Sequence, residues 1–187
     1  MSNVLIPLAP GCEELEAVTL IDILRRADIK VITASLDSGS QVKPVTASRA
    51  VVLIPDMTLD DALLNDYDMI VLPGGLPGAD HLDNDIRIHS ILKKMAAEKK
   101  YTAAICAAPK ILANANLLEG KAATSYPGFL DKMDLKNTQI KDQPVVHDGT
   151  VITSRGPGTA MDFALSLVEI LTGKEKRDEV AAGLLWP

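Results

Sequence analysis

The sequence predicts a single doubly wound α/β domain, in which a mostly parallel sheet lies between two layers of helices. Three observations predict it. Short apolar, β-branched runs recur along the chain, and stretches of helical period separate most of them, as in parallel βαβ units. No linker rich in Gly, Ser or Pro divides the 187 residues, a length that fits one domain. The expected strands cover residues 4–9, 31–35, 51–54, 69–72, 102–105, 122–125 and 150–153.

The first helix is expected over residues 13–27, directly after the first strand. It carries one apolar stripe at helical spacing, which the sheet should cover, and a second apolar patch on another side. A helix that is apolar on two sides has two neighbours, such as the sheet and a partner subunit. The stripe consists of Ala17, Leu20, Ile21 and Leu24, and the second patch of Leu15 and Val18.

Two hairpins and the C-terminal helices complete the expected elements. Residues 42–45 and 51–54 form two short strands of an insertion beyond the main sheet, preceded by the turn signal Ser38-Gly39. Asp148-Gly149 separates the runs 145–147 and 151–152, a strong short-range signal for a second small hairpin. A long helix is expected over residues 159–171, ended by Gly173, with a short helix after it to about residue 185.

Composition narrows the function classes. The net charge of −6 disfavours direct binding of nucleic acid, which requires a basic surface. No apolar run approaches the ~20 residues of a membrane helix, and the N-terminus lacks the features of a signal peptide, so we expect a cytoplasmic protein. Two distant cysteines make no disulfide framework, and the three histidines show no metal-ligand spacing, so we expect neither a metal nor another cofactor.

Cys106 is the first candidate for chemistry. An apolar strand leads directly into it, small residues lie two positions before and after it, and a helical pattern follows at once. The nucleophile elbow of hydrolases has this layout, with Ser in place of Cys. The start of the helix should favour the thiolate. The alternative is a buried structural cysteine.

Two further loops supply groups that suit such a thiol. Gly74-Gly75 follows a strand, and their backbone N–H groups, with that of Ala107, could form an oxyanion hole; the alternative is a simple tight turn. The segment after the first strand is acidic. Its carboxylates would repel phosphate, which disfavours the binding of a flavin or nucleotide cofactor. Glu16 in this segment could be a partly buried acid with a raised pKa beside the thiolate. No Cys-His-Asp triad is visible, because the histidines lie in segments expected at the surface.

Four motifs occur in order: Glu14-Leu15-Glu16, the segment 72–75, the segment 104–109 around Cys106, and the segment 153–159. Together they resemble the ThiJ/PfpI superfamily, in the branch of the parkinsonism-associated protein deglycase and its bacterial relatives, over essentially the whole chain. The resemblance implies a flavodoxin-like fold and a homodimer. It implies that Cys106 is the reactive thiol, that Glu16 is the protonated acid beside it, and that Gly74, Gly75 and Ala107 line the oxyanion site.

The resemblance also places Arg49 near the pocket at the dimer interface, with Arg26 as a weaker candidate. Tyr126 stands where many relatives carry His before a proline. A tyrosine can donate a hydrogen bond but is no base near neutral pH, since its pKa is about 10. Without a histidine at this position, Cys106 and Glu16 remain as the candidate catalytic residues.

Three hypotheses for the function remain, of which the family's activities suggest the first two. The first is a cofactor-independent glyoxalase or deglycase, in which Cys106 attacks a methylglyoxal-type α-oxoaldehyde, or its early adduct on a protein or nucleotide, and releases lactate. The second is a redox-sensing stress protein or chaperone switched by oxidation of Cys106. The third is a small-molecule binding module without turnover. Both of the first two require an accessible, acidic thiol, so the sequence does not separate them.

Overall fold

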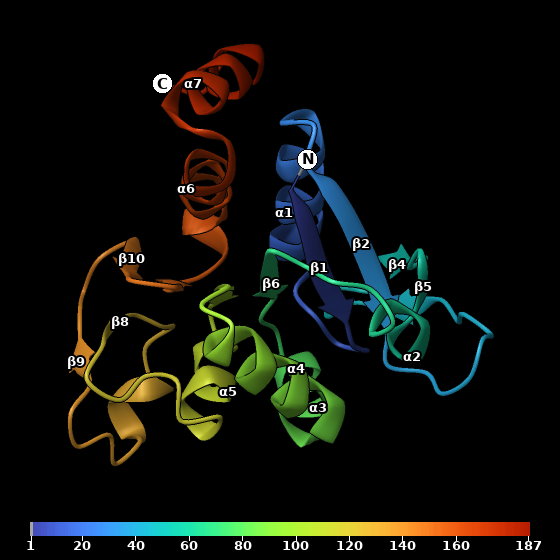
Figure 1. Ribbon diagram of the computed structural model, residues 1–187, viewed down its shortest axis with the longest axis horizontal. Coiled ribbons are helices and arrows are strands. Elements are labelled where there is room, and N and C mark those ends of the chain that lie inside the picture. Colours follow the sequence, from blue (N-terminus) through green and yellow to red (C-terminus); the bar gives the residue numbers. More distant parts are fainter. Residues whose placement is uncertain (1) are drawn as a thin grey trace.

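The computed structural model describes residues 2–187, and it has the predicted α/β architecture (Figure 1). Seven strands form one sheet in the order β10-β11-β7-β6-β1-β2-β5, in which every described neighbouring pair except β10 and β11 is parallel. The central strands are almost entirely buried, as strands covered on both faces must be. The strands are β1 (Asn3–Leu8), β2 (Lys30–Ser35), β5 (Met57–Thr58), β6 (Met69–Leu72), β7 (Tyr101–Ile105), β10 (Val145–Asp148) and β11 (Val151–Ser154).

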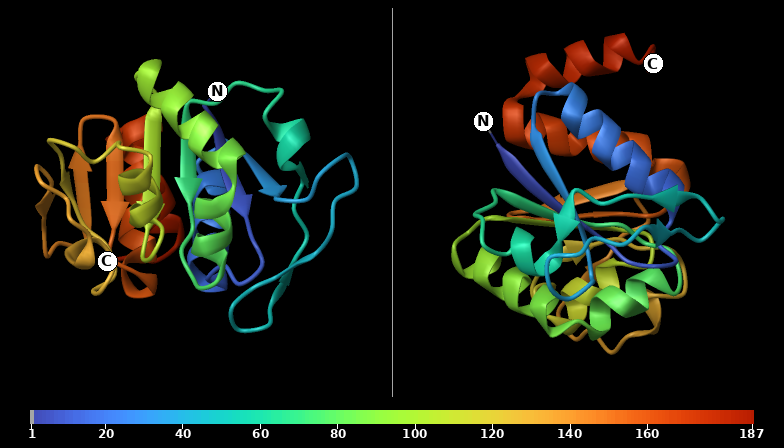
Figure 2. Two further views of the ribbon diagram at one scale, coloured as in Figure 1. Left: turned by 90° about the horizontal axis from the view of Figure 1, so that it is seen from below. Right: turned by 90° about the vertical axis from the view of Figure 1, so that its right-hand side faces the viewer.

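Helices cover both faces of the sheet (Figure 2). One layer holds α1 (Glu14–Arg26), α6 (Ala160–Thr172) and α7 (Lys174–Gly183), which pack in succession against one another. The other layer holds α2 (Leu59–Ala62), α3 (Gly78–Asn84), α4 (Ile86–Ala97) and α5 (Pro109–Asn114). Two apolar cores result, one on each face, and the alternating side chains of the strands divide between them. The chain also contains two short 3₁₀ turns, Leu130–Lys132 and Pro157–Thr159.

Helix α1 begins one residue later than expected and keeps the predicted two-sided character. Ala17, Leu20 and Leu24 are fully buried, while Ile23 takes the place in the core that we expected for Ile21. Leu15 and Val18 are 50% and 45% exposed. The second apolar patch is therefore present and uncovered within the chain.

The hairpin predictions are only partly right. The insertion does form an antiparallel hairpin of β3 (Val45–Thr46) and β4 (Val52–Leu53), separate from the main sheet. The second hairpin, β10–β11, is not peripheral, because β11 pairs in parallel with β7 and extends the main sheet. The Asp-Gly turn and the strand expected over residues 150–153 are both confirmed, and only the description of this hairpin as small and peripheral is wrong.

One expected strand of the sheet is placed elsewhere, and one sheet strand was not predicted. Residues 122–125 contribute only β8 (Ala122–Ala123), which pairs with β9 (Gln139–Ile140) in a separate small sheet. The edge strand β5 has two residues and is too short for a period to be recognised. Within residues 2–187, no helix is long and apolar enough to cross a membrane.

Candidate active site

Cys106 lies at the sharp turn between β7 and α5. Its φ of +65° is in the left-handed region, which is uncommon for a residue with a side chain and marks backbone strain. The turn is held on both sides, because the Cys106 N–H donates to the Ser154 carbonyl at 3.0 Å and the Tyr126 N–H donates to the Cys106 carbonyl at 2.8 Å. Pro109 opens the helix, where its missing N–H costs nothing. The strand-to-helix elbow predicted from the sequence is therefore present.

Glu16 is a fully buried carboxyl in the first turn of α1. Its Oε2 accepts a hydrogen bond from the Gly74 N–H at 2.8 Å, and Oε1 has no partner among the described residues. Burial raises the pKa of Glu16 to about 7, against the opposing effect of the Gly74 N–H. A carboxyl with this pKa can exchange protons near neutral pH.

Gly74 brings Glu16 and Cys106 together. A Cβ on Gly74 would lie 2.7 Å from the Cβ of Cys106 and 2.9 Å from Oε2 of Glu16, so a side chain there would force the two functional groups apart. Its N–H is already committed to Glu16. The structure therefore corrects one expectation: Gly74 anchors the acid and does not offer a free donor to an oxyanion.

Two other backbone N–H groups face the thiol. Those of Gly75 and Ala107 hydrogen-bond the sulfur of Cys106 and lower its pKa. Gly75 has a φ of +86°, and a Cβ at this position would lie 2.3 Å from the backbone nitrogen of Glu13. A glycine is thus required for the backbone to reach the sulfur. Both donors therefore act on the sulfur of Cys106.

The thiol is not acidic while Glu16 is charged. Burial, followed by the charge and hydrogen bond of Glu16, raises the pKa of Cys106 to about 12, and the two backbone donors only reduce that effect. We expected the helix start to favour the thiolate, but α5 has only six residues and the adjacent carboxyl outweighs it. Near neutral pH the pair therefore carries at most one negative charge, and that charge lies on the carboxyl of Glu16.

A cavity of about 300 Å³ opens onto Cys106. Arg49 and Tyr126 both line it, as the resemblance implied, whereas Arg26 lies in the last turn of α1 and pairs with Asp22. The sequence analysis did not single out Phe129. Aromatic residues make up only 3% of the chain, and this rarity was a usable signal. The cavity is lined by Glu13, Ser48, Arg49, Gly75, Leu76, Cys106, Ala107, Tyr126, Phe129 and Pro157.

Glu14 positions the hairpin that carries Arg49. Its carboxylate accepts hydrogen bonds from the Arg49 N–H at 2.7 Å and the Ser48 hydroxyl at 2.8 Å. Although burial opposes it, these bonds hold the pKa of Glu14 below its usual value. No local pattern indicates this role of Glu14, because the hairpin is 35 residues away along the chain.

Comparison with known proteins identifies the family. The model of the DJ-1/PfpI family matches residues 2–170. The chain belongs to the DJ-1/PfpI family. It is 44% identical to protein dj-1beta of Drosophila melanogaster, over 98% of this chain and 96% of that protein. The crystal structure of Drosophila dj-1beta superposes with a TM-score of 0.93 at 43% identity and covers both chains completely.

Two other relatives bear on the chemistry of this DJ-1/PfpI family chain. It is 35% identical to a Caenorhabditis elegans protein named glutathione-independent glyoxalase DJR-1.2, over 95% of this chain and 93% of the relative. A structure described as Toxoplasma gondii DJ-1, oxidized, superposes with a TM-score of 0.92 at 37% identity, covering 100% of this chain and 99% of the other.

The second cysteine of this DJ-1/PfpI chain is chemically different from the first. Cys12 is fully buried in the core beneath α1, and burial together with the charge of Glu14 raises the pKa of its thiol to about 11. Because the pKa of Cys106 is raised as well, the difference between the two thiols is access: Cys12 is enclosed in the core, whereas Cys106 lines the cavity. Within residues 2–187, no group of three or more His, Cys, Asp or Glu side chains is placed to hold a metal.

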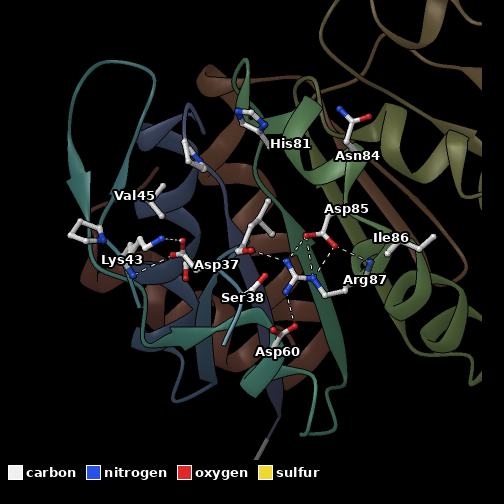
Figure 3. Close-up of a pocket in the computed structure, with 14 residues that line it drawn as sticks. Asp37, Ser38, Lys43, Val45, Asp60, His81, Asn84, Asp85, Ile86 and Arg87 are labelled. Carbon is white, nitrogen blue, oxygen red and sulfur yellow. Dashed lines mark hydrogen bonds and ion pairs between the residues drawn. The ribbon is translucent and has the colours of Figure 1, made fainter. Parts of the chain in front are cut away.

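A wider cavity of about 750 Å³ lies at the carboxyl ends of β1 and β2, away from Cys106 (Figure 3). Its charged groups are paired with one another. The Arg87 guanidinium donates to Asp60 and Asp85, each at 2.6 Å, and to the Leu36 carbonyl at 2.7 Å. Asp60 also accepts the Gly39 N–H. We interpret this cluster as the clamp that holds the loop after β2 against α2 and α4.

The Arg87 clamp leads to a stability prediction. Arg87→Leu leaves Asp85, whose side chain is only 14% exposed, without its cation. Because the pair is partly solvated, we expect a loss of about 2 kcal/mol in the free energy of unfolding, measured by urea denaturation. A variant as stable as the wild type would show that the clamp contributes nothing.

Proposed function

We propose that the chain is a cofactor-independent glyoxalase acting on methylglyoxal-type α-oxoaldehydes or on their early adducts with proteins or nucleotides. The observation that carries this proposal is the pairing of a thiol on a strained turn with a buried acid of pKa about 7. The name of the C. elegans relative supports it.

The first step joins the thiol to the aldehyde. Glu16 takes the proton of Cys106, and the sulfur forms a bond to the aldehyde carbon. The carbonyl oxygen becomes an oxyanion, which the N–H groups of Gly75 and Ala107 stabilise until it takes the proton from Glu16, leaving Glu16 a carboxylate again. The product is a hemithioacetal.

The second step moves a hydrogen between neighbouring carbons. Glu16, as a carboxylate, removes the proton from the former aldehyde carbon to give an enediol, and returns it to the adjacent carbon. The result is a lactoyl thioester on Cys106. Water then cleaves the carbon–sulfur bond, which releases lactate and restores the thiol. The net reaction adds one water to one methylglyoxal and needs no external oxidant or reductant.

The test is lactate formation from methylglyoxal by the full-length protein, without glutathione and in the presence of a chelator. We expect catalytic turnover with lactate equal to the aldehyde consumed. Aldehyde loss without lactate would indicate simple trapping by side chains and would overturn the proposal. The same assay on a methylglyoxal-treated peptide distinguishes free aldehyde from adduct as the substrate.

A second candidate function is redox sensing at Cys106. The oxidized Toxoplasma relative favours it, as do the two N–H groups that would stabilise an oxidised sulfur. The sulfur would attack hydrogen peroxide, forming an S–O bond as the O–O bond breaks and water leaves; a second peroxide would give the sulfinate. Intact mass after mild peroxide treatment tests it: no gain of two oxygen atoms at Cys106 would exclude this function.

We also propose that the chain forms a homodimer through the exposed patch of α1 and the neighbouring hairpin. Leu15 and Val18 of α1 lie exposed together with Val51, Val52 and Ile54. The hairpin is held beside α1 by the hydrogen bonds of Glu14. Exposed apolar groups of two adjoining elements are typical of a subunit interface.

The dimer proposal predicts that Val18→Arg yields a monomer, because a charge in the centre of an apolar interface has no partner. Light scattering after size exclusion measures the mass. We expect twice the chain mass for the wild type and the chain mass of 20.0 kDa for the variant. The control is Leu64→Arg at an isolated residue that is 85% exposed. A monomeric wild type would overturn the proposal.

A further inference from the structure

The cavity at Cys106 is larger than the proposed chemistry alone needs. The reacting carbons must lie beside the sulfur of Cys106, which borders the cavity. A cavity of about 300 Å³ is at the lower end of the size range for much larger ligands. A methyl substituent would leave most of it filled with water.

The additional space is bordered by an aromatic wall, formed by Tyr126 and Phe129. The two rings meet edge to face, with centroids 6.5 Å apart and planes at 75°. Leu76, which is 51% exposed, and Pro157 extend the apolar border of the same cavity. An apolar group bound here would cover side chains that water now contacts.

Both rings have neighbours within the protein. The Tyr126 N–H is bonded to the carbonyl of Cys106, and its ring lies so close to Gly156 that a Cβ there would be 3.1 Å from the ring. The Nζ of Lys110 lies 6.0 Å from the centroid of the Phe129 ring, within cation–π range, and is itself held by Asp80. Contacts that exist before a substrate binds reduce the ordering that binding requires.

We propose that the aromatic wall selects the substituent of the substrate, so that the enzyme prefers α-oxoaldehydes with a planar aromatic substituent over methylglyoxal. Phe129 is the specificity-determining residue. An aromatic substituent gains both apolar burial and edge-to-face contact with the ring. This inference rests on the proposed glyoxalase function and deepens it.

The test compares kcat/KM for phenylglyoxal and methylglyoxal in the wild type and in Phe129→Ala. The ratio of the two constants within one protein is the measured quantity, and comparing this ratio between proteins cancels the different intrinsic reactivity of the aldehydes. We expect the ratio to fall about ten-fold or more in Phe129→Ala. Phe129→Leu, which keeps apolar volume but removes the ring, should give an intermediate ratio and protects the test against a misfolded alanine variant.

The matched control is Trp186→Ala, which removes an aromatic ring outside the cavity and should leave the ratio unchanged. An unchanged ratio in both folded Phe129 variants, with turnover of both aldehydes by the wild type, would overturn the specificity inference alone. Turnover of neither aldehyde by the wild type would overturn the proposed function, and the inference with it.

Discussion

Replacing Cys106 with serine is expected to reduce lactate formation from methylglyoxal by about 10³-fold or more. A serine hydroxyl is a far weaker nucleophile than a thiol, and Glu16 with a pKa of about 7 is too weak a base to ionise it. The substitution is nearly isosteric, so the strained turn and the hydrogen bond to Ser154 should remain. Steady-state kinetics with direct detection of lactate measure the effect.

The matched control for this prediction is Cys12→Ser. Cys12 is the other free cysteine, and it is buried in the core with a pKa of about 11. We expect this variant to be less stable, because a hydroxyl replaces an apolar sulfur, while the folded protein retains turnover. Equal activity of Cys106→Ser and the wild type would exclude covalent catalysis at Cys106. If the folded Cys12→Ser variant lost activity while Cys106→Ser kept it, the nucleophile would not be Cys106.

Glu16→Gln is expected to lower kcat/KM by about 10² to 10⁴-fold and to remove its pH dependence near neutrality. In the wild type, the pair of Glu16 and Cys106 must lose one proton before the sulfur can attack. Activity should therefore rise with pH through about 7, the pKa of Glu16. Glutamine can accept the Gly74 N–H but cannot carry a proton between carbons. If kcat/KM of the variant still rose with pH near 7, the group that titrates there would not be Glu16.

The same variant is expected to be more stable than the wild type at pH 8. The pKa of Glu16 is about 7 when folded, against 4.5 for an unperturbed glutamate, so the folded state binds this proton more tightly. Wild-type stability should therefore fall as pH rises from about 4.5 through 7. At pH 8 the neutral glutamine avoids a cost of up to about 3 kcal/mol. Denaturant unfolding at pH 8 and pH 5 should show the gain shrinking at the lower pH; a gain independent of pH would contradict this account.

Glu14 and Glu16 illustrate which roles in the site can be predicted from the sequence and which cannot. Both lie in the first turn of one helix, but Glu14 accepts hydrogen bonds from the hairpin, whereas Glu16 accepts one from Gly74. Glu16 could be assigned because its motif is shared by a family. The role of Glu14 depends on a hairpin folded back from residues 45–53, whose position is set by tertiary hydrogen bonds. Local patterns carry no information about such distant pairings.

The strands show the same difference between features set by local patterns and features set by distant pairing. Strands with four or more buried residues were recognised, because their runs are long enough for a pattern. The two-residue strands β5 and β8 were missed or assigned to the wrong sheet, since pairing with a neighbour defines them. At the site, the sequence placed Cys106 on its turn, but the committed N–H of Gly74 and the raised pKa of the thiol arise from burial and contacts across the sheet.

The dispersion of the site along the chain has a consequence for folding. Glu16, Gly74 and Cys106 follow β1, β6 and β7, three adjacent strands whose parallel pairing joins residues about 30 to 65 positions apart. Such non-local pairing forms late and cooperatively in folding. A nascent or partly unfolded chain therefore exposes an ordinary thiol without its acid or its backbone donors. Catalytic competence appears only with the completed domain, so the rate at which Cys106 acquires its native reactivity during refolding reports the global folding step.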